Sequence, residues 1–296
     1  MRAFFSLIHR EYLEHRLAYV FAPAGLVVLI AAASLYVWLT APTGLDAADL
    51  PVNSGRKLYD IGYAAAVNGW WIYMLASVFF YYADTFQADM RNNAMLFWKS
   101  MPQSDLKISA SKLVAGLTVF PAAVFLAAVV TGLLLILPAS VAAGAFGFTA
   151  QLGFGEAMAS FANLTAIGFV YFVLGLLWYA PFFAWVGLLS TIFGRWSIPL
   201  AFLVPAVLVI FELLVIRPAG APDGSYLLSF LQYRGQYGFG DYNLELTVLL
   251  AMPVEAAKVI GDMLANYDWV AAVAGAAVAV LLLVASAEYR RRRLLT

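Results

Sequence analysis

The residues of this chain that could carry out acid–base or metal chemistry are few and widely separated. The only histidines, His9 and His15, are six positions apart, a spacing that does not place them on one face of a helix. The intervening sequence, HREYLEH, does not match the H-E-x-x-H pattern of zinc proteases. Cysteine is absent, which excludes disulfides and thiolate metal sites. We therefore predict no metal site in this chain.

The composition is that of a membrane protein. Apolar residues make up 64% of the 296 positions and charged residues only 11%, with a mean hydropathy of +0.85. Soluble domains have about 45–50% apolar and about 25% charged residues. Lys plus Arg and Asp plus Glu are equal at 17 each, so the net charge does not indicate a nucleic-acid partner. Because backbone groups in lipid must be hydrogen-bonded internally, we expect an all-α polytopic fold in a single transmembrane domain, 1–296.

Stretches without ionisable residues are long enough to cross about 30 Å of hydrocarbon. They predict six membrane-spanning helices, near 17–40, 61–83, 113–137, 162–193, 198–216 and 268–287. The third is expected to end at Pro138, with the Ala/Gly-rich stretch 139–155 as a loop or shallow interfacial segment. Pro181 predicts a kink or break in the fourth, and the fifth is short, with prolines at 199 and 205.

Basic residues indicate the orientation of these helices. If both chain ends are cytoplasmic, 12 of the 17 Lys and Arg residues fall on the cytoplasmic side and 5 on the external side. The run Arg290–Arg293, directly after the last predicted span, is the strongest anchor. We therefore expect a multi-pass protein of the cytoplasmic (inner) membrane with both termini in the cytoplasm.

Four segments outside the predicted spans are long enough to carry function, although the external loop 42–60 is short and polar and indicates little. Residues 1–16 read as an amphipathic helix lying on the cytoplasmic surface, with a solubilising charged tail as the alternative. Residues 84–112 form a cytoplasmic loop, much longer than a simple connection needs. Residues 217–267 form the largest external segment, and their apolar stretches suggest re-entrant helices that dip partway into the membrane.

The 84–112 loop contains a compact apolar cluster followed by a turn and a helix start. Met95 to Trp98 supply the cluster, Pro102 the turn, and Ser104-Asp105 the helix start, with an acid in the first turn. Exposed aromatic residues beside Lys99 and Lys107 suit either a partner protein or the lipid headgroup layer.

At this loop the chain resembles the permease subunits of ABC-2 type transporters. The resemblance rests on an acidic-basic stretch at Asp89–Arg91, then Leu96–Pro102 (LFWKSMP), Ser104–Leu106 (SDL) and Lys112-Leu113. These motifs cover about 30 residues, and the predicted order of helices and long segments agrees over the rest of the chain.

The resemblance implies the membrane half of an ATP-driven exporter. In that family the loop between spans 2 and 3 forms a coupling helix that docks on a separate ATPase subunit, and two permeases pair, here as a homodimer or a heterodimer. It assigns the ATPase contact to Phe97, Trp98, Lys99, Pro102, Ser104, Asp105 and Leu106. No G-x-x-x-x-G-K-[ST] phosphate loop occurs in the chain, so ATP and Mg²⁺ would be bound by the partner and this subunit would not itself be an enzyme.

Three residues within the predicted spans are candidates for a translocation path. Glu212 would be costly as an ion at the bilayer centre, and it either reaches the outer interface to pair with Arg217 or faces the path. Trp178 and Trp185 are seven positions apart and share a helix face, where they line a pathway or pack against protein or lipid. In the last span the small residues Ala271, Gly275 and Ala279 recur every four positions and favour close helix packing, within the subunit or between two copies.

The functional prediction is a permease that exports a hydrophobic or amphiphilic substrate by alternating access. A peptide, drug, lipid or glycolipid would each fit. The alternative is a membrane scaffold or assembly protein without transport activity. An intramembrane enzyme would need paired polar groups at membrane depth, and the predicted spans contain only Glu212.

Overall fold

The regular elements of the chain are helices. A computed structural model describes residues 2–40, 54–91, 105–145, 152–216, 225–244, 247 and 254–293. Within these residues the sole β-type pairing is an isolated bridge between Phe239 and Tyr242. The all-helical fold class is therefore confirmed.

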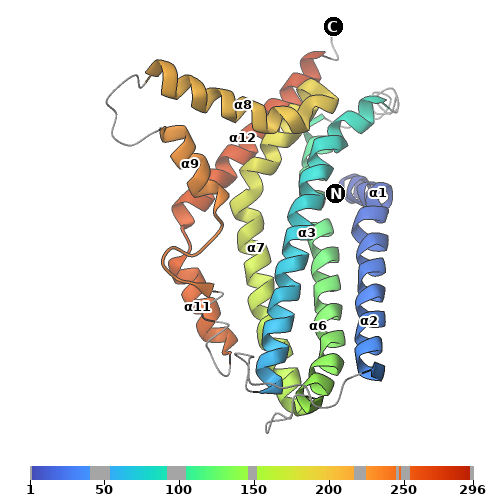
Figure 1. The fold of residues 1–296 in the computed structure, drawn as a ribbon. Helices are drawn as coiled ribbons and strands as arrows, with labels where there is room; N and C mark the ends of the chain where they lie inside the picture. The colour runs from blue at the N-terminus through green and yellow to red at the C-terminus, as the bar shows by residue number, and fades with distance from the viewer. Residues whose placement is uncertain are drawn as a thin grey trace.

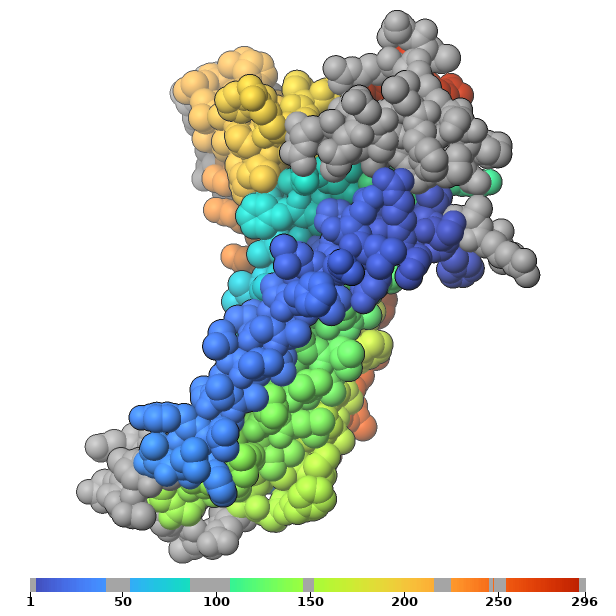
Figure 2. All heavy atoms as spheres, turned by 90° about the vertical axis from the view of Figure 1, so that its right-hand side faces the viewer, coloured from blue at the N-terminus to red at the C-terminus, as the bar shows by residue number. Residues whose placement is uncertain are grey.

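Five long helices stand roughly side by side (Figure 1). They are α2 (Ala22–Thr40), α3 (Gly55–Arg91), α6 (Phe120–Ala145), α7 (Phe154–Phe193) and α12 (Trp269–Arg293). Helix α7 packs against α3 on one side and α12 on the other, and α6 packs between α3 and α2. Figure 2 shows α2 on the outside of the molecule, running along α6.

Among the described residues, five helical runs are long and apolar enough to cross a membrane: Phe4–Thr40, Gly55–Thr85, Lys107–Ala145, Phe154–Val215 and Trp269–Arg292. The length and the apolar composition of these helices thus support the membrane character of the protein. The fourth run contains both the fourth and the fifth predicted spans.

The fifth predicted span does not run alongside the other helices. Helix α8 (Ser197–Phe211) lies crosswise at one end of the molecule and continues into a π-helical turn, η5 (Glu212–Ile216) (Figure 1). The change of direction occurs at the 3₁₀ turn η4 (Gly194–Trp196), where Gly194 has φ 59° and ψ −120°, a conformation that glycine tolerates best. A charge-free stretch shows that a helix is apolar but not which way it points.

Two helices continue through a proline, and one predicted boundary is therefore wrong. Helix α6 passes through Pro138 and ends at Ala145, so residues 139–145 are not a loop. A proline removes one backbone donor, and the Ala-rich residues that follow keep the helix favourable. Helix α7 is likewise continuous through Pro181, so the break considered there does not occur, and a kink at this proline stays a prediction.

The loop predicted at 84–112 is shorter than expected at both ends. Helix α3 continues to Arg91, and α5 (Asp105–Val114) begins at Asp105, where the Ser104-Asp105 pattern predicted a helix start. Helix α5 then joins α6 through a π-helical turn, η3 (Ala115–Val119).

The ends of several helices meet at one end of the molecule. Helix α1 (Arg2–Arg16) is the helix predicted at 1–16, and it joins α2 through the π-helical turn η1 (Leu17–Phe21). In Figure 1, α1, the end of α3 and the C-terminal end of α12 all lie at the upper end. Helix α5 contacts α1 and α12 there. We call this the basic end, because Arg10 of α1, Lys107 and Lys112 of α5, and Arg290–Arg292 of α12 lie at it.

The core of the bundle is built from aromatic rings on α3 that fit over glycines of its neighbours. A Cβ added to the glycine would overlap the ring in each of three pairs: Tyr82 over Gly116, Tyr63 over Gly132 and Trp71 over Gly175. Small residues let membrane helices approach closely.

Tyrosine hydroxyls then bond to backbone carbonyls of the adjacent helix. Tyr59 donates to Gly132 O at 3.0 Å and Tyr82 to Leu113 O at 2.7 Å. These bonds fix α3 against α5 and α6 without burying charge.

Candidate functional site

A buried polar cluster joins three helices at the basic end. Lys112 of α5 donates through Nζ to Glu11 Oε1 of α1 at 2.9 Å, and to the carbonyl and hydroxyl oxygens of Thr85 on α3 at 3.1 and 3.0 Å. Tyr81 of α3 donates to Glu11 Oε2 at 2.9 Å, and Thr85 Oγ1 donates to the same oxygen at 3.3 Å. We call these four residues the α1 junction.

The α1 junction is shielded from solvent and well hydrogen-bonded. Lys112 is only 2% exposed and Glu11 5%. Breaking a buried ion pair by removing one partner costs about 3–5 kcal/mol, because the other charge is left uncompensated. The junction therefore holds α1, α3 and α5 together as one unit.

The α1 junction lies directly next to the proposed coupling segment in the chain. Thr85 precedes the segment, near the end of α3, and Lys112 follows it on α5. The predicted contact residues Phe97, Trp98, Lys99, Pro102 and Ser104 lie outside the described residues. Asp105 and Leu106 form the first residues of α5. A force on this segment would therefore reach α3, α5 and α1 together.

A cluster of potential metal ligands adjoins the junction but is engaged in ion pairs. Ligand atoms of Glu11, Glu14 and His15 lie within 4.8 Å of one another. Glu11 is bound by Lys112, and Glu14 accepts from Arg10 Nε at 2.6 Å. Acidic side chains that are neutralised by neighbouring cations do not make a metal site, so the cluster gives no reason to revise the prediction of none.

A large apolar cavity lies on the side of α7 that faces α8, α9 (Tyr226–Gly235) and α12. Its volume is about 870 Å³, within the usual range for small-molecule sites of about 300–1,000 Å³. Helices α7, α8, α9 and α12 form its walls, and Phe79 of α3 also contributes. We call it the lateral cavity.

A single cation, Arg234 of α9, lies in the wall of the lateral cavity as the structure describes it. Its Nη2 donates to Trp178 O at 2.8 Å and its Nη1 to Ala271 O at 3.3 Å, and its Cζ lies 4.2 Å from the centre of the Trp178 ring. Burial lowers the pKa of Arg234, while Tyr267, Tyr233 and Asp268 act to raise it. A guanidinium remains charged even so.

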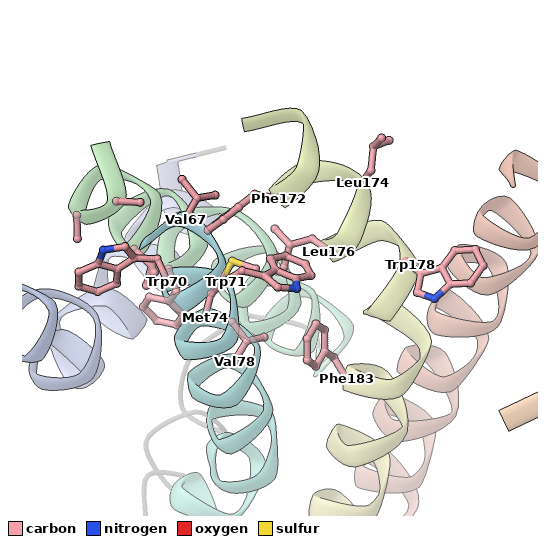
Figure 3. Close-up of a cluster of buried hydrophobic side chains, with 14 of the residues drawn as sticks. Val67, Trp70, Trp71, Met74, Val78, Phe172, Leu174, Leu176, Trp178 and Phe183 are labelled. Atoms are coloured by element: carbon pink, nitrogen blue, oxygen red, sulfur yellow. The ribbon is translucent and has the colours of Figure 1, made fainter. Parts of the chain in front are cut away.

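Trp178 and Trp185, which share a helix face, have different environments. Trp178 is buried behind Arg234 and donates through Nε1 to Arg234 O at 2.9 Å, on the side of α7 away from Trp71 (Figure 3). Trp185 lines the lateral cavity and donates to Ala201 O of α8 at 3.4 Å. Only Trp185 faces the space that a ligand would enter.

Glu212 binds the start of α9. Its carboxylate accepts from Ser225 Oγ at 2.5 Å, from Tyr226 N at 2.7 Å and from Leu227 N at 3.0 Å. The first amides of a helix have no partner within it, so a carboxylate at that position is stabilised by both hydrogen bonds and the helix dipole. Glu212 therefore positions α9, and with it Arg234. Arg217, the partner expected from the sequence, lies outside the described residues.

The small residues of α12 pack against α7 within the chain. Ala279 contacts Ala180 and Ala184, and Ala271 supplies the carbonyl that accepts from Arg234. Gly275 lies directly under the guanidinium, where a Cβ would overlap Nη2. The spacing of the three residues thus serves a helix seam and gives room to Arg234.

The segment predicted to be external at 217–267 packs against the middle of α7. Tyr179 donates to Gly235 O at 2.8 Å, Tyr237 donates to Tyr171 O at 2.8 Å, and Tyr267 donates to Leu174 O at 2.9 Å. Helix α11 (Ala256–Asn266) also contacts α7. Sequence reasoning assigned Arg234 to an external loop and gave Glu11 no partner. For Arg234, the neighbouring tyrosines in the sequence were a signal that it packs against protein. For Glu11, no signal in the sequence indicated its partner.

A comparison of the chain with models of known protein families, with curated proteins and with solved structures finds no match in any of the three.

Proposed function

We propose that this chain is the membrane-spanning permease subunit of an ATP-driven exporter of the ABC-2 type. The observation that carries the proposal is the α1 junction. It ties the two helices that flank the Phe97-Trp98 segment to each other and to α1 through a buried ion pair. A loop that only connected two spans would not require such a rigid support.

In this mechanism a partner ATPase binds the coupling segment on the cytoplasmic side, which is the basic end. ATP and Mg²⁺ are bound by the partner. When the ATPase moves the segment, α3, α5 and α1 move as one unit because the α1 junction holds them. Since α3 packs along α7, the motion is transmitted to the helices around the lateral cavity. The cavity then opens to alternate sides of the membrane and moves a hydrophobic or amphiphilic molecule.

The proposal includes a second permease copy. Helix α8 has an exposed apolar surface that includes Phe202, Leu203, Val207, Leu208, Ile210 and Phe211. Apolar patches of this kind are covered by lipid or by another protein chain. A dimer of this subunit with two ATPases fits that surface.

Co-purification of the full-length chain from its native membrane tests the proposal. An ATPase subunit should be recovered with the wild-type chain and lost from a variant with Phe97→Ala and Trp98→Ala, because aromatic anchors carry much of the energy of protein interfaces. Phe154→Ala is the matched control. Phe154 is 78% exposed and lies at the opposite end of the molecule, so this variant should retain the ATPase.

The alternative, a membrane scaffold without transport activity, predicts a different result. A scaffold would bring down other partners, and the aromatic pair would not affect any ATPase. Recovery of the wild-type chain without an ATPase would contradict the exporter proposal. Retention of the ATPase by the Phe97→Ala, Trp98→Ala variant would show that the aromatic pair of the coupling segment is not the ATPase contact.

A further inference from the structure

The charge of Arg234 is buried beside an apolar space, and no carboxylate of the described residues is bound to it. The side chain is 4% exposed, and among the described residues no Asp or Glu oxygen lies within ion-pair distance of it. The carboxylate that does act on it electrostatically, Asp268, is engaged by Tyr233 Oη and by Ala271 N, the latter at 2.9 Å. Buried charges are costly unless they are paired, so a buried guanidinium at a cavity wall, without an ion-pair partner among the described residues, points to a missing anion.

The structure holds the guanidinium in place from three sides. Two carbonyl oxygens accept from Nη1 and Nη2, the Trp178 ring lies against Cζ, and Gly275 leaves the space that Nη2 occupies. A guanidinium has five N–H donors in a fixed fork, two of which donate to these described carbonyls. Arg234 lines the cavity, and its other N–H groups are the donors that we assign to an anionic oxygen.

The rest of the cavity wall suits a hydrocarbon chain. Its other described side chains are aromatic or aliphatic apart from the hydroxyl of Tyr233, and they extend from Arg234 along α8. Among the wall residues are Phe79, Phe182, Trp185, Phe202 and Val209. The cavity thus combines one fixed cation with an extended apolar surface.

We propose that the lateral cavity binds an amphiphile with a single anionic head, a carboxylate or a phosphate, at Arg234 and an apolar chain toward α8. That this ligand is the cargo rests on the proposed export function, whereas the binding site itself does not. Both a fatty acid and an acidic phospholipid carry this chemistry.

Binding can be measured on the purified full-length chain in a neutral detergent. The probe is cis-parinaric acid, whose fluorescence rises in an apolar site, and its methyl ester is the uncharged counterpart. Arg234→Gln should weaken binding of the acid by about ten-fold or more, because charge-assisted hydrogen bonds are lost. Binding of the methyl ester should change by less than about two-fold, because the apolar wall is unaltered.

Three further variants separate the site from general effects. Gly275→Ala retains the charge but displaces the guanidinium, and should also weaken the acid more than the ester. Ala206→Trp fills the apolar part of the cavity and should weaken both probes. Lys258→Gln removes an exposed cation from α11, outside the cavity wall, and should change neither.

Competition distinguishes the two sources of the anion. Oleate represents a free carboxylate, lysophosphatidic acid a phosphate head, and lysophosphatidylcholine a head without net charge. Displacement of parinarate by one or both anionic lipids, but not by the zwitterionic one, supports the proposal and identifies the head. Equal displacement by all three, or equal binding of acid and ester to the wild-type chain, would show a non-specific lipid groove and overturn it.

These outcomes are independent of the ATPase experiment. Selective binding of the anionic probe by a chain that recovers no ATPase would support the binding site and contradict the exporter proposal. Recovery of the ATPase together with unselective binding would support the exporter proposal and contradict the binding site.

Discussion

The energetics of the α1 junction depend on the two charges being present together. Lys112 and Glu11 are far apart in the sequence, 101 positions, and their side chains meet in a nearly solvent-free space. Taking either charge out of water costs several kcal/mol, and the partner charge and the hydrogen bonds from Tyr81 and Thr85 offset that cost. The pair therefore attaches α1 at one specific position. An apolar contact would specify that position less strictly.

We expect Lys112→Met to destabilise the chain by about 3–5 kcal/mol, because it leaves the Glu11 carboxylate buried without its cation. The double variant Glu11→Leu, Lys112→Met should be less destabilised than the sum of the two single variants. Thermal unfolding in mild detergent, followed by circular dichroism, measures these differences.

The exposed pair Arg10–Glu14 on the same helix is the control for this measurement. Its side chains are 35% and 41% exposed, so Arg10→Gln should cost less than about 1 kcal/mol. Additive effects of Glu11→Leu and Lys112→Met would show that the two charges do not interact as the structure indicates.

At the scale of elements, the position of α9 is determined by contacts at both of its ends. Glu212 accepts from the first amides of the helix, and Trp178 and Tyr179 of α7 donate to the carbonyls of Arg234 and Gly235 at its last turn. Helix ends that lack such partners are costly away from water. A ten-residue helix can therefore pack beside a long apolar one without exposing unsatisfied backbone groups.

We expect Glu212→Gln to loosen the start of α9, because a neutral amide oxygen is a weaker acceptor than a carboxylate at a helix N-terminus. The amides of Tyr226 and Leu227 should exchange hydrogen about ten-fold faster. Exchange measured by mass spectrometry over 225–235 tests this.

Glu255→Gln is the matched control for this exchange experiment. Glu255 stands at the start of α11, is exposed and makes no side-chain bond to that helix, so its replacement should leave the amides of α11 unchanged. Unchanged exchange at Tyr226 and Leu227 in the Glu212→Gln variant would contradict the assigned role.

The contact of α3 with α7 depends on a glycine. We expect Gly175→Ala to cost about 1–3 kcal/mol, because the added Cβ overlaps the Trp71 ring and the two helices must separate. A second substitution, Trp71→Phe, should restore part of the loss by making room. Gly25→Ala on α2 is the control, since a Cβ there meets nothing within 4 Å, and its thermal stability should not fall.

Helix existence was more predictable from the sequence than helix direction. The charge-free stretches predicted α2, α3, α6, α7 and α12, because apolar length alone makes a helix in a membrane-like interior. The crosswise course of α8 and the packing of α9 against α7 were not predictable in this way. They depend on bonds such as Trp178 Nε1 to Arg234 O, which join residues 56 positions apart.

The candidate residues also differ in how far the sequence alone could predict their surroundings. Trp185, a candidate for the translocation path, lines the lateral cavity, and its part in a path stays a prediction. Glu212 and Arg234 were harder to interpret, because the role of a charged residue in an apolar setting depends on its partners. Their partners come from other helices, and a single sequence gives no information on those pairings.

At the scale of the whole molecule, the chain returns to its starting end without a sixth upright helix. Helices α2, α3, α6 and α7 alternate in direction, and α7 ends at the basic end (Figure 1). Helix α12 also ends there, so the chain between them must descend. It does so through α8, α9 and α11, which lie successively lower in Figure 1. The fifth predicted crossing is therefore replaced by a broken path along α7, beside the lateral cavity.

This path predicts that both ends of the chain label from the same side of the membrane. The sequence has no cysteine, so single-cysteine variants can be labelled without background. Ser6→Cys on α1, Lys107→Cys on α5 and Arg291→Cys on α12 should react with a membrane-impermeant maleimide only after permeabilisation of right-side-out vesicles. Gly155→Cys, at the opposite end of α7, should react in intact vesicles. Reaction of Ser6→Cys and Arg291→Cys from opposite sides would require an odd number of crossings. The descent through α8, α9 and α11 would then be wrong, and the lateral cavity would no longer lie between the ends of a membrane-crossing path.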